Sequence, residues 1–551
     1  MKYILFAIFN IIFCLSANSQ HITNTLGTGG FFRIKDNNTT YLSLSQSDGV
    51  IDIFKSIRLA SVPSSYNGVI FKGASSFIHT YYATGQSNHN TFVGLDAGNF
   101  TMTSASDNTA VGFMSLRNLS TGYSNSAFGV YTLFYNSTGN GNSAFGTSTL
   151  YHNNTGNYNT GFGTISLYEN TTGSNNSAFG FFSLRSNTTG NDNSAFGYRA
   201  LVTNLTGNNN SAFGTSALET NITGSDNSAF GNYSLINNTT GHHNSSFGAS
   251  SMLKNISGIY NSSFGFWSLK ENIDGSYNNG FGSQTLTNNT TGENNSAFGF
   301  GALNLNISGS SNTAVGHNSL DGNISGTGNT SVGSFSLTGN TTGQLNTVVG
   351  YQAGSNIVTG SNNTLIGYNT EPTSTSVSNQ ITLGNNSVTS LRCNVTTITS
   401  LSDGRDKKNI HDLTLGLDFL SKLKPRIYNW DKREWYENNQ SDESKMQKVP
   451  TAGFIAQELD EIQSTHKAEW LNLVLKDNPE KWEATPGNLL PVMVKAIQEL
   501  KSENDFLRSD IAEMKMEIQK LKSLEEKLGL LEKLVKNIPE DKSKTKEIRN
   551  Q

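Results

Sequence analysis

A strict period of 17 residues governs the middle of this chain. One apolar residue recurs at every seventeenth position from Val111 to Leu383, through 16 intervals without an insertion. The consensus unit is Phe-Gly-x-x-Ser-Leu-x-x-Asn-x-Thr-Gly-x-x-Asn-Ser-Ala, and Val93 stands one residue out of phase before the series. Repeats this regular are typical of a solenoid in which each repeat forms one rung. The period argues against disorder, which so much Asn, Gly, Ser and Thr would otherwise indicate.

The rung sequence predicts a mainly β fold, a parallel β-solenoid over residues 93–385. Two short strands fit each rung, Asn-Ser-Ala-Phe-Gly and then x-x-Ser-Leu, with Asn and Gly in the turns between them. The Gly after Phe and the Gly of Thr-Gly suit turns that need a positive φ. At about 4.8 Å per rung, the array would form a rod of roughly 80 Å.

A single rod of this kind has little apolar area with which to offset the entropy of ordering 17 residues per rung. Packing on identical chains would supply more. The segments 108–112 and 312–316 read Asn-Thr-Ala-Val-Gly. With the variant Asn-Ser-Ala-Phe-Gly, they resemble the head repeats of trimeric autotransporter adhesins. The resemblance implies a left-handed β-roll in a homotrimer. It does not imply that family's export route, because no β-barrel translocator is recognisable downstream.

One rung position opens Asn-x-Ser/Thr sequons in most repeats. These could be glycan acceptors on an exposed turn. Alternatively, their stacked amides could hydrogen-bond along the rod as an Asn ladder, which we favour because turn chemistry already explains the residues. The sequon residues are Asn136, Asn153, Asn170, Asn187, Asn204, Asn221, Asn238, Asn255, Asn289, Asn306, Asn323 and Asn340.

Other functions of the repeats are less favoured by the residues. Regular Thr rows are compatible with an ice-binding or carbohydrate-binding face, although Thr-Gly in a turn explains them too. A glycan-cleaving solenoid would need two carboxylates at a fixed separation. The repeat carboxylates follow no such spacing; examples are Asp226, Asp274, Glu293 and Asp321. The Gly-Gly-x-Gly-x-Asp pattern of calcium rungs is not present. We therefore predict neither a metal nor a cofactor.

The N-terminal part predicts export. Residues 1–19 read as a secretory signal peptide, with Lys2, an apolar run and small residues before Gln20. The run is too short for a good membrane span, so no membrane span is expected after its removal. Residues 20–92 carry short β-type runs and are expected to form a β-rich cap. Cys393 would then be the only thiol of a secreted or cell-surface chain, which precludes an intrachain disulfide.

The composition changes abruptly at Ser402-Asp403-Gly404-Arg405-Asp406-Lys407-Lys408-Asn409-Ile410. This stretch resembles the start of the intramolecular chaperone and auto-processing domain of endosialidase-type phage tailspikes and tail fibres. Three further matches follow in the family's order over about 100 residues. They lie at 423–430, 453–459 and 491–500. The resemblance implies a self-cleaving serine peptidase domain, which we place at 402–487, after a β neck at 386–401. It also implies cleavage between Leu401 and Ser402.

The spacing of the motif suits that chemistry. A serine hydroxyl needs a base, and a lysine can serve if burial and neighbouring positive charges favour its neutral form. Lys407 can fold back to Ser402 across one turn, with Arg405 and Lys408 as the neighbouring charges. Asp403, Arg405 and Asn409 are expected to orient the site. The alternative is that Ser-Asp caps a helix and that Lys407 is solvated.

A long helix is predicted at the C-terminal end. Residues 488–538 carry a heptad seam of apolar residues, with Asn504 in the seam, and residues 539–551 form a charged tail. The seam pattern leans towards dimers, so the trimer prediction comes from the resemblance. Four of the five Trp residues follow Ser402, which places the globular core there.

These features together predict an exported, homotrimeric fibre or adhesin-like protein. Its C-terminal domain would assist trimer assembly and then release itself, in a single turnover. The formal net charge of −4 gives no indication of a nucleic-acid partner. A cell-surface glycan or host surface is a candidate partner. Two alternatives stay open: a glycan-binding or glycan-degrading tailspike-like protein, and a passive surface-layer or ice-binding solenoid that is never cleaved.

Overall fold

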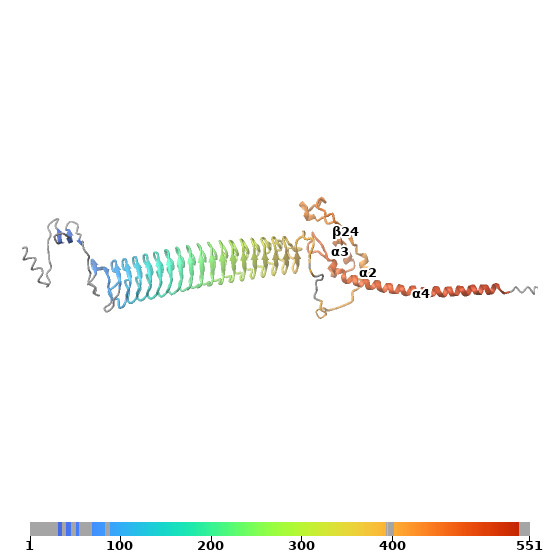
Figure 1. The fold of residues 1–551 in the computed structure, drawn as a ribbon, viewed down its shortest axis with the longest axis horizontal. Helices are drawn as coiled ribbons and strands as arrows, with labels where there is room; N and C mark the ends of the chain where they lie inside the picture. Colours follow the sequence, from blue (N-terminus) through green and yellow to red (C-terminus); the bar gives the residue numbers. More distant parts are fainter. Residues whose placement is uncertain are drawn as a thin grey trace, which may run out of the picture. The chain divides into compact units, whose positions relative to one another are not determined.

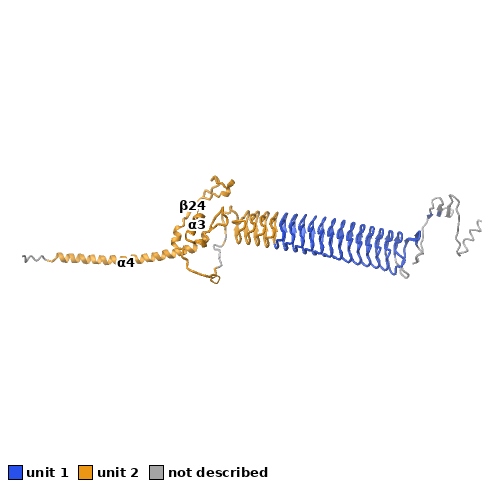
Figure 2. Cartoon of the chain, turned by 180° about the vertical axis from the view of Figure 1, so that it is seen from behind, with its two compact units in different colours: residues 1–311 blue, residues 312–551 orange. Residues whose placement is uncertain are grey.

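The computed structural model describes residues 31–35, 40–45, 51–53, 69–82, 89–392, 394 and 402–538. The signal peptide, Cys393, Leu401 and the charged tail lie outside the described residues. The chain divides into two compact units, residues 1–311 and 312–551, which we treat separately (Figure 2).

The first unit begins with two small antiparallel arrangements and continues as a parallel β-solenoid (Figure 1). Strands β1 (Phe31–Lys35), β2 (Thr40–Ser45) and β3 (Ile51–Ile53) form one sheet. Strands β4 (Ile70–Lys72) and β5 (Ser75–His79) pair with each other, and β5 pairs with β6 (Thr91–Val93). From β6 onward, each strand pairs in parallel with the corresponding strand of the next rung. The remaining strands of this unit are β7 (Thr109–Val111), β8 (Ser126–Phe128), β9 (Ser143–Phe145), β10 (Thr160–Phe162), β11 (Ser177–Phe179), β12 (Ser194–Phe196), β13 (Ser211–Phe213), β14 (Ser228–Phe230), β15 (Ser245–Phe247), β16 (Ser262–Phe264), β17 (Asn279–Phe281) and β18 (Ser296–Phe298).

The second unit carries five further rungs and a small α/β region. The rung strands are β19 (Thr313–Val315), β20 (Thr330–Val332), β21 (Thr347–Val349), β22 (Thr364–Ile366) and β23 (Ile381–Leu383). The α/β region contains α2 (Leu417–Lys422), β24 (Arg426–Tyr428), β25 (Thr451–Gly453), α3 (Ala456–Thr465), β26 (Val474–Leu475), β27 (Glu483–Ala484) and α4 (Leu490–Lys536), with short 3₁₀ turns between them. The mainly β fold class with 17-residue rungs is confirmed.

The rung interior is unusual because amides fill much of it. The middle Ala of the strand and the Leu five residues after the Phe are fully buried, together with two Asn residues per rung. The first Asn precedes the strand; Asn210 donates from Nδ2 to Asn193 Oδ1 at 3.1 Å. The second is the sequon Asn; Asn221 donates from Nδ2 to Asn204 Oδ1 at 2.7 Å. The sequon residues therefore form the predicted Asn ladder. Their amides are buried and inaccessible to a glycosylating enzyme in the folded chain.

Two details of the predicted rung are wrong. Each rung has one three-residue strand instead of two, because the Leu of Ser-Leu adopts a left-handed conformation, such as φ 51° at Leu218. This turn directs the Leu inward. The Gly of Thr-Gly needs no positive φ. A Cβ at Gly224 would stand 2.4 Å from both Asn221 Oδ1 and the carbonyl oxygen of Gly241, so close contact between rungs excludes a side chain there.

The α/β region has an aliphatic core around one aromatic ring. Phe419 of α2 packs with Leu459 and Ile462 of α3 and with Val492 at the start of α4. The location of the globular core after Ser402 is confirmed. Among the Trp residues, Trp482 is partly buried and packs against this core. Trp430 and Trp470 are 42% and 60% exposed.

Candidate functional site

The predicted dyad lies on a short turn at the start of the α/β region. Residues Gly404–Asp406 form a single 3₁₀ turn, and the Asp403 carboxylate caps it by accepting from the Arg405 backbone N–H at 2.9 Å. The chain leaves the turn in an extended conformation at Lys407, with φ −111° and ψ 140°. This reversal brings residue 407 back beside residue 402.

The turn brings the two predicted catalytic groups into contact. Lys407 Nζ donates a hydrogen bond to Ser402 Oγ. The alternative prediction was that Ser402-Asp403 caps a helix and that Lys407 is solvated. Asp403 does cap a turn, but Lys407 also contacts Ser402. The scissile carbonyl would belong to Leu401, which lies outside the described residues. The structure therefore describes the contact between the Ser402 hydroxyl and the Lys407 amine, but not the Leu401–Ser402 peptide bond on which they would act.

The Arg405 side chain is engaged by Asp403. Arg405 Nε lies 3.0 Å from Asp403 Oδ1, and Arg405 Nη2 lies 2.5 Å from Asp403 Oδ2. The hydrogen bonds from Arg405 hold the pKa of the Asp403 carboxyl below its usual range, and Asp403 raises the pKa of Arg405. Arg405 is thus a neutralised partner of Asp403 rather than the unpaired positive charge that we expected beside Lys407. Its role is to fix the turn.

The other supporting residue, Asn409, ends this segment. It adopts a left-handed conformation with φ 53°, which Asn tolerates better than most residues. All residues from Ser402 to Asn409 are exposed in the single chain. A lysine acts as a base only when its amine is neutral, and burial favours that form. The single chain supplies the contact between the dyad groups but leaves Lys407 open to water.

Helix α4 links the α/β core to a long exposed seam. Its first turns belong to the core through Val492 and Ala496. Further along, the predicted seam residues are solvent-exposed; Leu507, Ile511 and Met514 are 47% to 56% exposed. A helix of 47 residues that exposes an apolar seam is typical of a strand of a coiled coil.

Sequence reasoning missed the function of Glu499 on α4. Its Oε2 accepts a hydrogen bond from the backbone N–H of Leu417 at 2.7 Å, so it caps the first turn of α2. Gly416 leaves room for this carboxylate, because a Cβ there would lie 2.2 Å from Oε2. The Glu lies in the matched segment 491–500, but nothing in its local sequence indicates a partner 82 residues away.

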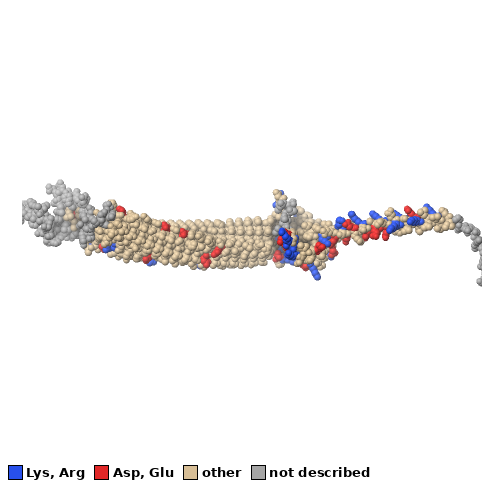
Figure 3. Space-filling model, turned by 90° about the horizontal axis from the view of Figure 1, so that it is seen from below, with Lys and Arg blue, Asp and Glu red and all other residues tan. Residues whose placement is uncertain are grey.

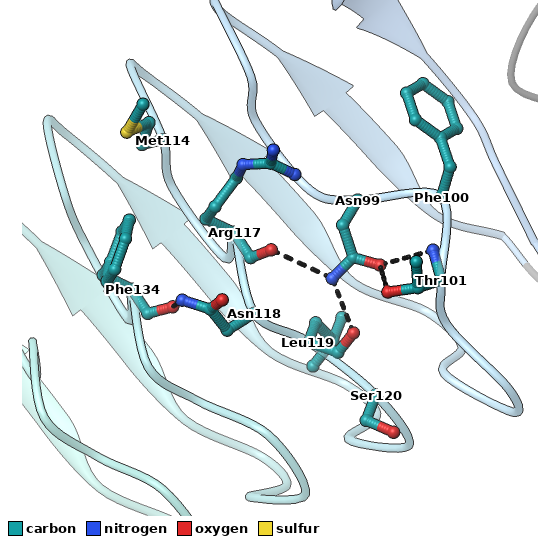
Figure 4. A pocket seen from close by; sticks show the side chains of 9 residues that line it. All are labelled: Asn99, Phe100, Thr101, Met114, Arg117, Asn118, Leu119, Ser120 and Phe134. Atoms are coloured by element: carbon teal, nitrogen blue, oxygen red, sulfur yellow. Dashed lines mark hydrogen bonds between the residues drawn. The ribbon is translucent and has the colours of Figure 1, made fainter.

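A shallow pocket of about 600 Å³ lies at the first rungs of the solenoid (Figure 4). Its central polar group is Asn99, whose Nδ2 donates to the carbonyl oxygens of Arg117 at 3.0 Å and Leu119 at 2.7 Å. The Asn99 Oδ1 accepts from the backbone of Thr101 at 2.8 Å. The bonds to Arg117 and Leu119 join one rung to the next. The pocket contains none of the predicted site residues.

In the described part of the chain, no group of three His, Cys, Asp or Glu side chains is placed to hold a metal ion. Within the same residues, no helix combines the length and the apolar character needed to cross a membrane.

Comparison with known proteins supports the assignment of the C-terminal region. Residues 402–467 match the family described as the chaperone of endosialidase, a peptidase family. The match begins at Ser402, the proposed nucleophile. The C-terminal region therefore carries a domain of the intramolecular-chaperone type, following a β-solenoid. The searches of curated proteins and of solved structures returned no match.

Proposed function

We propose that this chain is an exported, trimeric fibre or adhesin-like protein whose C-terminal domain assists assembly and then releases itself by cutting between Leu401 and Ser402. The observation that carries this proposal is the hydrogen bond from Lys407 Nζ to Ser402 Oγ. That contact lies at the first residue of the chaperone-of-endosialidase match. A serine and a lysine in contact at the first residues of such a domain are placed to cut the peptide bond that precedes the domain.

The reaction conserves atoms and protons at each step. Ser402 Oγ attacks the carbonyl carbon of Leu401, and its proton passes to the neutral amine of Lys407. The ammonium returns the proton to the amide nitrogen of Ser402 as the C–N bond breaks. This leaves an ester between Leu401 and Ser402 Oγ and a free α-amine. Water then hydrolyses the ester, which yields a Leu401 carboxylate and restores the Ser402 hydroxyl.

The exposed site suggests how cutting is linked to assembly. The Ser402 and Lys407 side chains are exposed in one chain, whereas a base lysine requires loss of water. Association of three chains through the α4 seam would place neighbouring surfaces near the site and desolvate Lys407. Cleavage would thus follow assembly. Removing the assembly domain would then leave a rod that cannot readily dissociate and realign.

The test is the mass of the purified protein, of two variants of the dyad and of one control variant. The wild type should yield fragments ending at Leu401 and starting at Ser402. Ser402→Ala and Lys407→Met should stay full-length while sedimenting as trimers. Lys448→Met, a change to an exposed lysine outside the 402–409 motif, should cleave normally. Cleavage of Ser402→Ala at the same bond would refute the mechanism. A wild-type chain that is uncut and monomeric would favour the passive solenoid.

A further inference from the structure

An aromatic ladder runs along the outside of the first unit. Its members occupy the last position of strands β8 to β18, at intervals of 17 residues. Neighbouring ring centroids are 4.4 to 5.1 Å apart, and their planes differ by 12° or less. We call this set the Phe ladder. It consists of Phe128, Phe145, Phe162, Phe179, Phe196, Phe213, Phe230, Phe247, Phe264, Phe281 and Phe298.

The rings of the Phe ladder are not part of the rung interior. The middle residue of each strand is buried, so the Phe beside it points outward. Five of the rings are 36% to 42% exposed, at positions 128, 162, 264, 281 and 298, and the others are partly buried. Eleven such rings form a long apolar stripe. Isolated exposed apolar residues are ordinary, but a continuous stripe marks an interaction surface.

The geometry of the stack limits what can bind there. Because each ring lies face to face with its neighbours, the ring faces inside the ladder are already covered, and only the edges reach solvent. A sugar binds an aromatic side chain by lying on the ring face. The ladder therefore offers an apolar ridge for packing rather than a platform for glycans.

The strands that carry the Phe ladder have no charged residue. The strands β8 to β18 contain only Ser, Thr, Asn, Ala, Gly and Phe. The face drawn in Figure 3 shows few charged atoms over the solenoid and many along α4. A surface without charges can be desolvated without leaving an unpaired ion.

A second exposed apolar row exists but is discontinuous. It includes Ile222, Ile256 and Ile307, which are 40% to 45% exposed. Thr239 and Thr290 interrupt it, and each hydroxyl donates to the next rung's carbonyl, at 3.2 and 3.0 Å. This row supplies a matched control surface.

We propose that the Phe ladder is the surface on which further copies of this chain pack in the trimer, with parallel rods side by side. This inference rests on the proposed trimeric assembly and identifies the face that it uses. A row of identical rings with one fixed spacing is best matched by another row with the same spacing, and a second copy supplies it. The α4 seam of the same chain independently requires copies of itself.

The ladder supplies part of the area that this role requires, since in a trimer each chain divides its contact surface between two neighbours. With about 200 Å² per Phe, and roughly 60 Å² of it exposed on average, eleven rings present on the order of 700 Å². One partner in a stable interface contributes about 800 Å². Phe181 and Phe266, which follow the ladder positions 179 and 264 by two residues, are also exposed. The ladder alone leaves register undefined, since a shift by one rung restores the same contacts. Alignment would therefore have to come from the non-repetitive C-terminal domain.

The first experiment is cross-linking of the full chain in a Cys393→Ser, Ser402→Ala background. Ser262→Cys places a thiol on the Phe-ladder face, two residues before Phe264. Ser257→Cys places one beside Ile256 on the control row. With a short bismaleimide, Ser262→Cys should give cross-linked chains and Ser257→Cys should give few. Stronger linking through Ser257, or equal linking at both sites, would overturn the proposal.

The second experiment uses charge. Phe264→Glu and Ile256→Glu replace side chains that are 37% and 44% exposed in the single chain. Because the new carboxylate can reach water in either case, neither substitution should unfold the rung that carries it. Burial of an unpaired carboxylate at an interface costs several kcal/mol, so Phe264→Glu should lower cross-linking through Ser262→Cys by at least about tenfold. Ile256→Glu should leave it within about twofold.

The outcomes separate this inference from the proposed function. A wild-type chain that sediments as a monomer would refute the trimeric assembly itself. A trimer whose cross-linking through Ser262→Cys is unaffected by Phe264→Glu would refute only the assignment of the Phe ladder. Hydrogen exchange of the rung strands confirms that each variant is folded.

Discussion

The buried Asn ladder should contribute substantially to stability between rungs, beside the backbone hydrogen bonds, and Asn238→Ala tests this contribution. Asn238 Nδ2 donates to Asn221 Oδ1 at 2.8 Å and to the carbonyl oxygen of Gly241 at 2.9 Å. Its Oδ1 accepts from Asn255 Nδ2 at 2.8 Å. Truncation to Ala removes all three bonds in the rung interior, where the Asn side chains are fully buried.

The expected cost follows from which partners lose their only bond. Gly241 keeps a second donor, Asn227 Nδ2, at 2.9 Å. Asn221 Oδ1 and one N–H of Asn255 are left unpaired. Each buried polar group without a hydrogen-bond partner lowers the stability by about 1–3 kcal/mol, so Asn238→Ala should lower the local unfolding free energy by about 2–6 kcal/mol. Asn237→Ala is the matched control, because Asn237 is exposed and donates one bond, to Leu253 O at 3.0 Å. It should cost less than about 0.5 kcal/mol.

Hydrogen exchange measured by mass spectrometry is the appropriate assay, since global unfolding of a long repeat array is not a two-state process. Amides in residues 221–258 should lose at least about 30-fold of their protection in Asn238→Ala. Distant rungs, such as 143–170, should keep theirs, because each rung contacts only its neighbours. Equal protection in Asn238→Ala and Asn237→Ala would refute the reasoning, because the ladder would then be no more stabilising than a surface amide.

Three further outcomes follow from the structure. Ile511→Glu, in the exposed seam of α4, should prevent both assembly and self-cleavage, whereas Ser509→Glu, off the seam, should leave both intact; sedimentation and fragment mass measure these. Glu499→Ala should destabilise the C-terminal domain by about 1 kcal/mol, as loss of a helix cap does, and urea unfolding followed by Trp fluorescence would show no change if the Leu417 bond were unimportant. Burial lowers the pKa of His79 from 6.5, so the unfolded chain takes up a proton there more readily than the folded chain. The first strands should therefore be fully stabilised above pH 6.5 and lose protection as pH falls below it, a trend that His79→Phe should weaken.

The repeat period was enough to predict the solenoid and the positions of its strands. It did not predict the path of the Ser-Leu segment, because a Leu in the left-handed region is locally unfavourable and only stacking of the rungs stabilises it. The role of the Gly of Thr-Gly could not be predicted from the repeat sequence either. Its sequence suggested a turn, whereas the actual constraint is the carbonyl of the next rung, which no single repeat reveals.

The candidate site, too, was predicted from the sequence only in part. The five-residue spacing predicted that Lys407 would reach Ser402, and the two side chains do meet. The influence expected of Arg405 on Lys407 stays a prediction. The sequence did not indicate that Asp403, two residues away, binds the Arg405 guanidinium through two hydrogen bonds. The exposure of the dyad could not be predicted at all. It depends on which surfaces cover the turn, and in the proposed trimer those surfaces would belong partly to other chains.

The exposed dyad and the exposed seam have a common consequence for timing. A nucleophile and a base that are complete in one chain would cut before the rods have aligned, and the assembly domain would be lost too early. An arrangement in which the contact between Ser402 and Lys407 is preformed, but the amine is still solvated, separates positioning from activation. Because the contact between Ser402 and Lys407 already exists in the single chain, little further entropy would be lost in positioning the two groups when the chains assemble. In the proposed mechanism, activation of the Lys407 amine would wait for the neighbouring chains, and the cut would follow their arrival.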